Sequence, residues 1–246
     1  MSIFTCDNKD EFIFDMFAYS ENSYFVDVGA SDGLYGSNTF SLENRGWSGL
    51  CIEPHPNLFE ELKKRSCDID NCLVGDSKGV VEFALQKNES HIKGFSGDNI
   101  FGGYSHAWRG GSGILSNWKK KRANATNDYD IIKMETNTLT SVLDKHKSPQ
   151  YIQLLDIDTE GNDCNVLKGI DWSKYRFACI LIEKNSDEVK SILKENDYSM
   201  EIEFSEEYLY VDNKKEGLIE NAKNIKNIGY WSHRVFGETC LRGASL

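Results

Sequence analysis

Residues 24–36 constrain the fold more than any other stretch, because an apolar segment there runs directly into an acidic, glycine-rich turn. The segment from Tyr24 to Val28 carries β-branched and aromatic side chains without interruption, which is typical of a buried parallel strand. Gly29 and Gly33 then lack the Cβ atoms that would keep a ligand away from the backbone. The stretch therefore predicts the first strand and turn of an α/β fold, with a small-molecule site at the turn.

The charge of this turn indicates which ligand it holds. Asp27 lies at the end of the strand and Asp32 within the turn, where a pyrophosphate would be repelled and an ammonium attracted. Residues 29–33 also lack the Gly-x-Gly-x-x-Gly pattern of dinucleotide-binding turns. Glu53 ends the next apolar segment, about 20 residues on, where an acid can accept both hydroxyls of a ribose. These features favour S-adenosylmethionine over NAD, although a turn that only caps the next helix would also carry an acid.

Length and charge limit the remaining possibilities. A chain of 246 residues can bury a full core as one α/β domain, with a short helical segment at 1–23 and a C-terminal extension at 212–246. The net charge of -11 argues against a nucleic-acid partner. The sequence shows neither a signal peptide nor an apolar run long enough to enter a membrane, which predicts a cytoplasmic protein. The oligomeric state stays open, and a homodimer is compatible with the sequence.

Apolar segments alternate with helical patterns along the chain, as in a doubly wound α/β sheet. Helices are expected at 38–45, 58–65, 164–167 and 189–195. Core strands are expected at 24–28, 49–52, 71–74, 151–157 and 177–182, with an added edge or hairpin strand at 79–85. Alternating apolar residues at 199–204 and 208–211 predict an antiparallel pair that closes the sheet.

Residues 86–128 interrupt this alternation. They are rich in Gly, Ser and Asn, yet they contain His106 and several aromatic side chains, among them Tyr104 and Trp108. A loop of this length in a compact domain is usually a functional lid or a disordered segment, and the aromatic residues favour a lid. Tyr104 and Trp108 are candidate substrate residues because flat rings suit the apolar faces of sugars. They would equally serve to pack the loop onto the sheet.

The chemical centre is expected at residues 156–163, because ligands of open α/β sheets bind beyond the carboxyl ends of the strands. Alternation within the strand places Asp156 and Asp158 on the same side. Glu183 ends the next strand and is a candidate for binding the substrate or, with Asp156 and Asp158, a divalent cation. Alternatively, Asp158 or Glu160 takes the proton of an acceptor hydroxyl that attacks a methyl group.

Two linked blocks of sequence carry a family resemblance. The first comprises Phe-Val-Asp-Val-Gly-Ala-Ser-Asp-Gly at 25–33, Ser-Asn-Thr at 37–39 and Gly-Trp-Ser-Gly-Leu-Cys-Ile-Glu-Pro at 46–54. The second comprises Ile-Asp-Thr-Glu-Gly-Asn-Asp at 157–163, Val-Leu-Lys-Gly-Ile at 166–170, Tyr-Arg-Phe at 175–177 and Ile-Glu at 182–183. In this order and spacing they resemble the FkbM-type methyltransferases, S-adenosylmethionine-dependent O-methyltransferases of sugar and natural-product pathways. The resemblance covers roughly residues 24–210. Asp156 departs from it, because such proteins often have Lys or Ser at that position.

The resemblance implies a class I methyltransferase fold. This is a Rossmann-like, doubly wound and mostly parallel seven-stranded sheet with an antiparallel C-terminal pair, here with the long insertion. It also implies the residues of the cofactor site. These are Asp27, Gly29, Ala30, Ser31, Asp32, Gly33, Ser37, Asn38, Glu53 and, near the adenine, Asp76.

The predicted function is transfer of a methyl group from S-adenosylmethionine to a hydroxyl of a sugar, glycan or related small molecule. Asp158, Glu160 and His106 are the candidate bases, since such a hydroxyl is not ionised at neutral pH. Three alternatives stay open: a metal-dependent O-methyltransferase that uses Asp158 and Glu183, a glycosyltransferase with an Asp-x-Asp motif at 156–158, and a cofactor-binding protein without catalysis.

Overall fold

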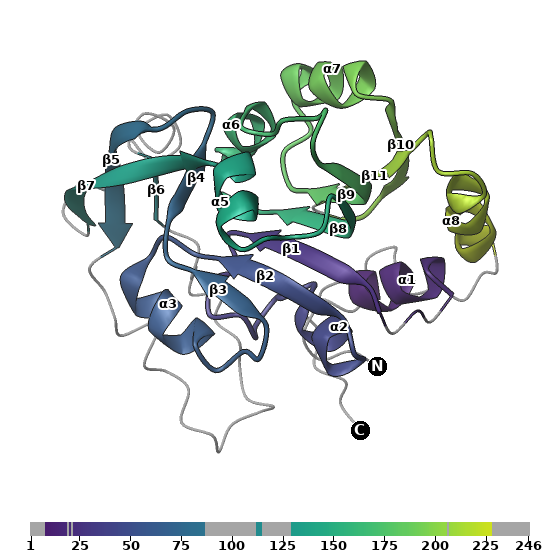
Figure 1. Ribbon diagram of the computed structural model, residues 1–246, viewed down its shortest axis with the longest axis horizontal. Coiled ribbons are helices and arrows are strands. Elements are labelled where there is room, and N and C mark those ends of the chain that lie inside the picture. The colour runs from purple at the N-terminus through teal and green to yellow at the C-terminus, as the bar shows by residue number, and fades with distance from the viewer. Residues whose placement is uncertain are drawn as a thin grey trace.

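The protein is described by a computed structural model, which covers residues 8–18, 20, 22–86, 112–114, 129–205 and 207–227. Its largest element is a seven-stranded sheet with the strand order β10-β11-β9-β8-β1-β2-β3 (Figure 1). The strands are β1 (Tyr24–Val28), β2 (Ser48–Ile52), β3 (Asp68–Asp70), β8 (Tyr151–Ile157), β9 (Arg176–Ile182), β10 (Tyr198–Glu203) and β11 (Tyr208–Asp212).

The directions of the strands agree with those predicted from the sequence. Strands β3, β2, β1, β8 and β9 pair in parallel, whereas β11 is antiparallel to both β9 and β10. The central strands are buried on both faces, which explains why they read as continuous apolar runs. The prediction of a mostly parallel sheet closed by an antiparallel C-terminal pair is confirmed.

Helices cover both faces of this sheet. They are α1 (Lys9–Met16), α2 (Phe40–Asn44), α3 (Pro56–Leu62), α5 (Leu139–Lys145), α6 (Asp163–Lys168), α7 (Asp187–Glu195) and α8 (Leu218–Asn227). One apolar cluster joins α1, α2 and α8 to one face, and a second joins α5, α6 and α7 to the other. Figure 1 shows these two groups of helices on opposite sides of the sheet. Local signals set the helix starts: Ser186 accepts a hydrogen bond from the Val189 N–H, and Pro56 occupies the first turn of α3.

A second sheet lies beside the first and has the order β4-β7-β5-β6. Its strands are β4 (Leu73–Gly75), β5 (Gly79–Gln86), β6 (Gly113–Ile114) and β7 (Tyr129–Thr138). The prediction that residues 71–74 form a core strand of the main sheet is therefore wrong. The third strand of the main sheet is β3, and β4 belongs to the second sheet. The Asn71 side chain donates hydrogen bonds to the carbonyl oxygens of Glu53 and Pro54, at 2.7 and 3.2 Å, and so fixes the turn that separates the two strands.

The strand predicted at 79–85 lies in this sheet too, between β7 and β6, and is not an edge strand. The sequence pattern predicts neither strand β7 nor helix α5. Within the predicted lid at 86–128, the structure describes only residue 86 and residues 112–114. Tyr104, His106 and Trp108 therefore lie outside the described residues. None of the helices in the described part of the chain is long and apolar enough to cross a membrane.

Candidate functional site

A cavity of about 260 Å³ opens beyond the carboxyl ends of β1, β2 and β8. The loops after these three strands form its sides, and β4, β5 and β6 of the second sheet complete it. Many of the predicted site residues line this cavity. They are Asp27, Gly29, Ala30, Ser31, Ser37, Asn38, Glu53, Asp156, Asp158 and Glu160.

Negative charge dominates the cavity lining. Five acidic side chains face the space, namely Asp27, Glu53, Asp156, Asp158 and Glu160, and no Lys or Arg is among the described residues that line it. We call the strand-end acids Asp27, Glu53, Asp156 and Asp158 the acidic edge. A cavity of this composition favours a cationic ligand and disfavours a phosphate-bearing one.

The turn after β1 brings three backbone segments into close contact. Gly29 has a φ of +94°, and a Cβ built on it would lie 1.9 Å from the carbonyl oxygen of Asp158. Its own N–H donates to the Ile52 carbonyl at 2.9 Å. Ser31 and Glu160 also adopt a left-handed backbone, with φ of 54° and 56°, which is costly for residues that have a Cβ. Only glycine fits at position 29, because the missing Cβ makes room for the Asp158 carbonyl. The close approach of a ligand to this backbone stays a prediction.

Glu53 connects the end of β2 to this turn. Its two carboxylate oxygens accept hydrogen bonds from the Ser31 and His55 backbone N–H groups, each at 2.8 Å. Burial raises the pKa of Glu53 to about 7. The two hydrogen bonds oppose this shift, whereas the nearby charges of Asp27 and Asp158 add to it. Each oxygen of the carboxylate keeps a lone pair for a further donor, such as a ligand hydroxyl.

Asp27 and the turn are supported by a buried arginine that the sequence pattern does not reveal. Asp27 accepts a hydrogen bond from the Thr39 hydroxyl at 2.6 Å, and burial raises the pKa of Asp27. Arg65 donates to the Gly33 carbonyl at 2.8 Å and to the Thr39 hydroxyl at 3.2 Å, and it pairs with Glu43. Nothing in the sequence distinguishes Arg65 from an exposed residue at the end of a basic helix turn.

A buried polar network lies behind the acidic edge. The Asn38 amide nitrogen donates to Asp156 at 3.0 Å and to both carboxylate oxygens of Glu207, at 3.2 and 3.3 Å. Glu207 in turn pairs with Lys9 of α1 at 2.8 Å. Burial raises the pKa of Asp156 well above its usual range, and the charges of Asp27 and Glu207 add to the effect. The sequence predicts neither Lys9 nor Glu207 as a site residue.

Asp158 differs from these buried acids because its side chain is open to solvent through the cavity. Protein atoms nevertheless crowd around it, and this partial desolvation raises the pKa of Asp158 to about 7. The charges of Glu207, Glu160 and Asp163 contribute in the same direction, whereas Lys9 opposes them. Asp158 therefore combines access to a ligand with a proton affinity suited to accepting a proton near neutral pH.

The opposite side of the cavity is apolar and comes from the second sheet. Leu73 and Val74 of β4, Phe83 of β5 and Ile114 of β6 line it, and we call these four residues the apolar wall. Phe83 is 2% exposed. The sequence does not predict this wall, because its pattern assigns 71–74 to the main sheet and 79–85 to an added edge or hairpin strand.

Four predicted site residues do not line the cavity. Asp32 accepts hydrogen bonds from the Leu34 and Tyr35 N–H groups, both at 3.0 Å, and so shapes the loop. Gly33 allows close packing against α3, since a Cβ there would lie 2.4 Å from a Leu62 methyl. The remaining two are Asp76, which is exposed and bonds to Ser77, and Glu183, which pairs with Lys184.

The described residues contain no cluster of three His, Cys, Asp or Glu side chains arranged to hold a metal ion. The trio Asp156, Asp158 and Glu183 is not brought together, because Glu183 lies off the cavity. Between the two strand ends lies Asp163, which accepts hydrogen bonds from the backbone N–H groups of Thr159 and Lys184, each at 3.0 Å. Asp163 thus joins the loops after β8 and β9 and has a structural role.

Most of the chain is similar to one family of known proteins. Residues 27–210 match the family model described as the methyltransferase FkbM domain, and a comparison with curated proteins gave no match. The matched segment covers well over half of the chain and extends from the end of β1 to β11, so it includes all of the acidic edge. The match favours methyl transfer over the glycosyltransferase alternative. The chain therefore belongs to the FkbM methyltransferase family, and the protein is a methyltransferase.

Proposed function

We propose that this methyltransferase binds S-adenosylmethionine in the cavity and transfers its methyl group to a hydroxyl of a sugar, glycan or related small molecule. The observation that carries the proposal is the lining of the cavity, where five acids face the space and none of the described lining residues is a Lys or an Arg. S-adenosylmethionine carries a sulfonium and an α-ammonium, both of which such a lining attracts.

The residues present fit this donor. Glu53 is placed to accept the ribose hydroxyls with the lone pairs that its two backbone hydrogen bonds leave free. The apolar wall, together with Ile52 and Leu58, suits the adenine ring. At the other end, Asp158 is open to the cavity, and Asn38 and Asp156 also line it.

The order of the strands supports a class I methyltransferase arrangement. The main sheet changes direction of progression between β1 and β8, and the cavity lies beyond this point. Open α/β sheets bind their ligands at such topological switch points. We include the Rossmann-like assignment in the proposal on this ground.

The proposed chemistry requires little of the protein beyond alignment and proton removal. When bound, the donor would supply a methyl group on a sulfonium, whose sulfur leaves as the thioether of S-adenosylhomocysteine when the C–S bond breaks. Asp158 accepts the proton of the acceptor hydroxyl as the oxygen attacks, since its raised pKa matches this task at neutral pH. The left-handed turn at Glu160 holds a second carboxylate at the same cavity, and Tyr35 offers an aromatic face to the acceptor.

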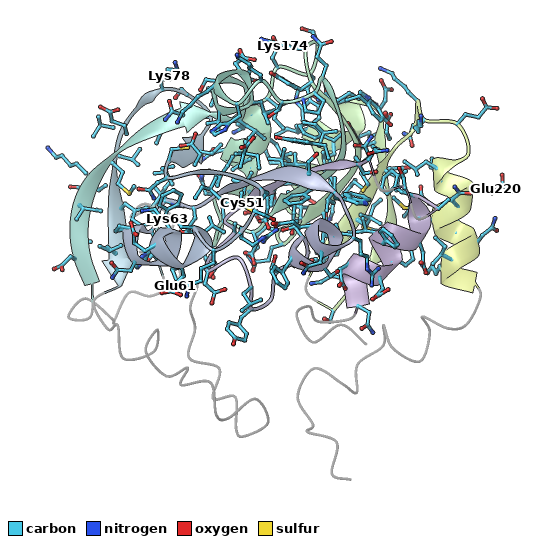
Figure 2. The ribbon with its side chains drawn as sticks, turned by 60° about the horizontal axis from the view of Figure 1, so that its bottom comes forward. Cys51, Glu61, Lys63, Lys78, Lys174 and Glu220 are labelled. Atoms are coloured by element: carbon cyan, nitrogen blue, oxygen red, sulfur yellow. The ribbon has the colours of Figure 1, made fainter. Side chains whose placement is uncertain are left out.

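Two measurements test the proposal. Calorimetric titration of the wild-type protein with S-adenosylmethionine and S-adenosylhomocysteine is expected to show binding that Glu53→Ala weakens strongly. Glu220→Gln, which removes an exposed carboxylate on α8, serves as the control (Figure 2). Absence of binding by the wild-type protein would overturn the proposal.

The role of Asp158 is tested by turnover with a panel of sugar and glycan acceptors. Asp158→Asn is expected to bind S-adenosylhomocysteine within about threefold of wild type and to lose about 100-fold or more in kcat, which is a typical contribution of a general base. Turnover that survives this substitution would show that the base is another residue.

A further inference from the structure

The apolar wall and the acidic edge face each other across the cavity but belong to two different sheets. None of the described strands belongs to both sheets, so strand pairing does not set the distance between wall and edge. Strand β4, which supplies two residues of the wall, is an edge strand of the second sheet and pairs only with β7. Some contact other than strand pairing must therefore hold β4 at its distance from the main sheet.

Helix α6 provides such a contact. It begins a few residues after Asp158 and lies beside β4 (Figure 1). At the start of the helix, the Asn162 amide nitrogen donates to the Val74 carbonyl of β4 at 2.7 Å. At its end, Gly169 approaches β4 so closely that a Cβ there would lie 2.3 Å from the Gly75 carbonyl oxygen. The helix that follows the loop after β8 thus holds the wall strand at two points.

The Asn162 side chain serves β4 and not its own helix. Asn162 is the N-cap residue of α6, where an Asn side chain commonly accepts a hydrogen bond from a backbone N–H of the first turn. In the described part of the chain its side chain makes no such bond. Its Oδ1 instead accepts from the Asn165 side chain at 2.8 Å, and only its nitrogen can donate to the Val74 carbonyl. The amide is therefore held in one orientation, in a residue that is 4% exposed and lines the cavity.

We propose that Asn162 is a positioning residue, which sets the distance between the apolar wall and the acidic edge by holding β4 against the start of α6. This role rests on the proposed function, in which the wall carries the adenine and Asp158 faces the acceptor. Asn162 acts through Val74 and its strand, and it needs no contact with the ligand. A misplacement of about 1 Å can lower the rate of a reaction by about 100-fold, so a fixed distance serves methyl transfer as well as binding.

Two substitutions of Asn162 test this role by titration calorimetry. Asn162→Ala and Asn162→Asp both remove the donor to the Val74 carbonyl, but the Asp variant keeps an acceptor for Asn165 and suits a helix N-cap. We expect both variants to bind S-adenosylhomocysteine and 5′-methylthioadenosine about tenfold more weakly than wild type, because the wall no longer meets the adenosine at the right distance. Since 5′-methylthioadenosine carries no net charge, its loss does not reflect the charge that Asn162→Asp adds.

Asn196→Ala is the matched control. The Asn196 side chain also donates to a backbone carbonyl, that of Ile192 at 2.8 Å, but at the end of α7. Its loss should change neither affinity. Titrations are made well below the unfolding temperature of each variant, so that a change in stability alone leaves the affinities as they are in wild type.

A double-mutant cycle with Leu73 tests whether Asn162 acts through the wall. Leu73→Ala shortens a wall side chain on β4, the strand that Asn162 holds. Residues that act through a shared contact give losses that are not additive in free energy. In the Leu73→Ala background, we therefore expect Asn162→Ala to weaken S-adenosylhomocysteine by only about threefold or less.

The outcomes separate failure of this inference from failure of the proposed function. If the wild-type protein binds neither ligand, the proposed function fails and the positioning role fails with it. If wild type binds both ligands and Asn162→Asp binds them within about twofold of wild type, Asn162 only supports the fold and the positioning role alone is overturned. Losses that multiply in the double variant would show that Asn162 acts independently of the wall, which also overturns the role.

Discussion

The acidic edge and the apolar wall enclose the same cavity, but the chain builds them differently. The acids of the edge stand at the ends of strands of the main sheet, and each strand and its acid form one continuous stretch of sequence. The wall comes from short strands of a second sheet whose pairing spans long separations, such as that of Val81 with Met134. The edge therefore depends on local backbone geometry and buried charge, whereas the wall depends on tertiary packing.

The largest effect is expected from a single methyl group in the edge. In Gly29→Ala the new Cβ would lie 1.9 Å from the Asp158 carbonyl oxygen, at a φ of +94°. The turn after β1 and the loop after β8 would have to move apart. We therefore expect a loss on the order of 4 kcal/mol in the free energy of unfolding, together with loss of S-adenosylhomocysteine binding. Chemical denaturation and titration calorimetry measure the two effects.

Gly36→Ala provides the matched control for this prediction. Gly36 also lines the cavity and has a positive φ of +73°, but a Cβ there would meet no atom within 4 Å. Only the backbone preference is then lost, at about 1 kcal/mol. Equal losses in the two variants would show that the close contact between the turn after β1 and the loop after β8 does not determine the stability of the acidic edge.

A somewhat smaller effect is expected from Arg65, which supports the edge from behind. Arg65→Leu would leave the Gly33 carbonyl without its donor and remove the buried cation that pairs with Glu43, which costs about 3 kcal/mol in the free energy of unfolding. The neighbouring Lys64→Leu removes only an exposed ion pair with Glu61, which is expected to leave stability nearly unchanged. Denaturation curves that do not distinguish the two variants would contradict a supporting role for Arg65.

The two regions also differ in how far the sequence predicts them. Apolar runs that end in Asp27, Glu53 and Asp158 predict both the strands of the main sheet and the acids at their ends, and the structure places all three at the cavity. Arg65 and Lys9 escape prediction, because a charged residue in an amphipathic stretch looks exposed until tertiary packing buries it.

The second sheet escapes prediction for a related reason. Strand β7 places the exposed side chains of Ile131, Lys133 and Glu135 on one face, and its partners lie far away in sequence. Strands with one solvated face give a weak signal, and their register is set by contacts that no local pattern records. The apolar wall therefore appears only once the fold is known.

The charge of the edge gives the next prediction. The pKa of Glu53 is about 7 in the folded protein and 4.5 as its ordinary value. Between these values the unfolded chain ionises first, so the free energy of unfolding falls as pH rises from about 4.5 to 7. The loss between pH 5 and pH 8 is on the order of 2 kcal/mol for this residue. Urea denaturation at these two pH values should show the fall in wild type.

Glu53→Gln isolates this contribution. The variant keeps an acceptor for the Ser31 N–H but cannot ionise, so its loss of stability between the two pH values should be clearly smaller than that of wild type. Asp158, whose pKa is also about 7, accounts for part of the pH dependence of stability that persists in Glu53→Gln. Parallel curves for wild type and Glu53→Gln would mean that Glu53 is ionised at little cost in the folded protein.

The smallest effect is expected in the apolar wall. Phe83→Leu keeps a buried apolar side chain but removes the aromatic face from the cavity, so S-adenosylhomocysteine and 5′-methylthioadenosine should both bind about fivefold more weakly, or by about 1 kcal/mol. Val80→Ala, on the same strand but 64% exposed, is the control and should change neither affinity. Because both ligands carry the adenosine, an equal loss locates the adenine at the wall. A loss confined to S-adenosylhomocysteine would instead place the amino-acid end of the ligand there and reverse the orientation that the acidic edge implies.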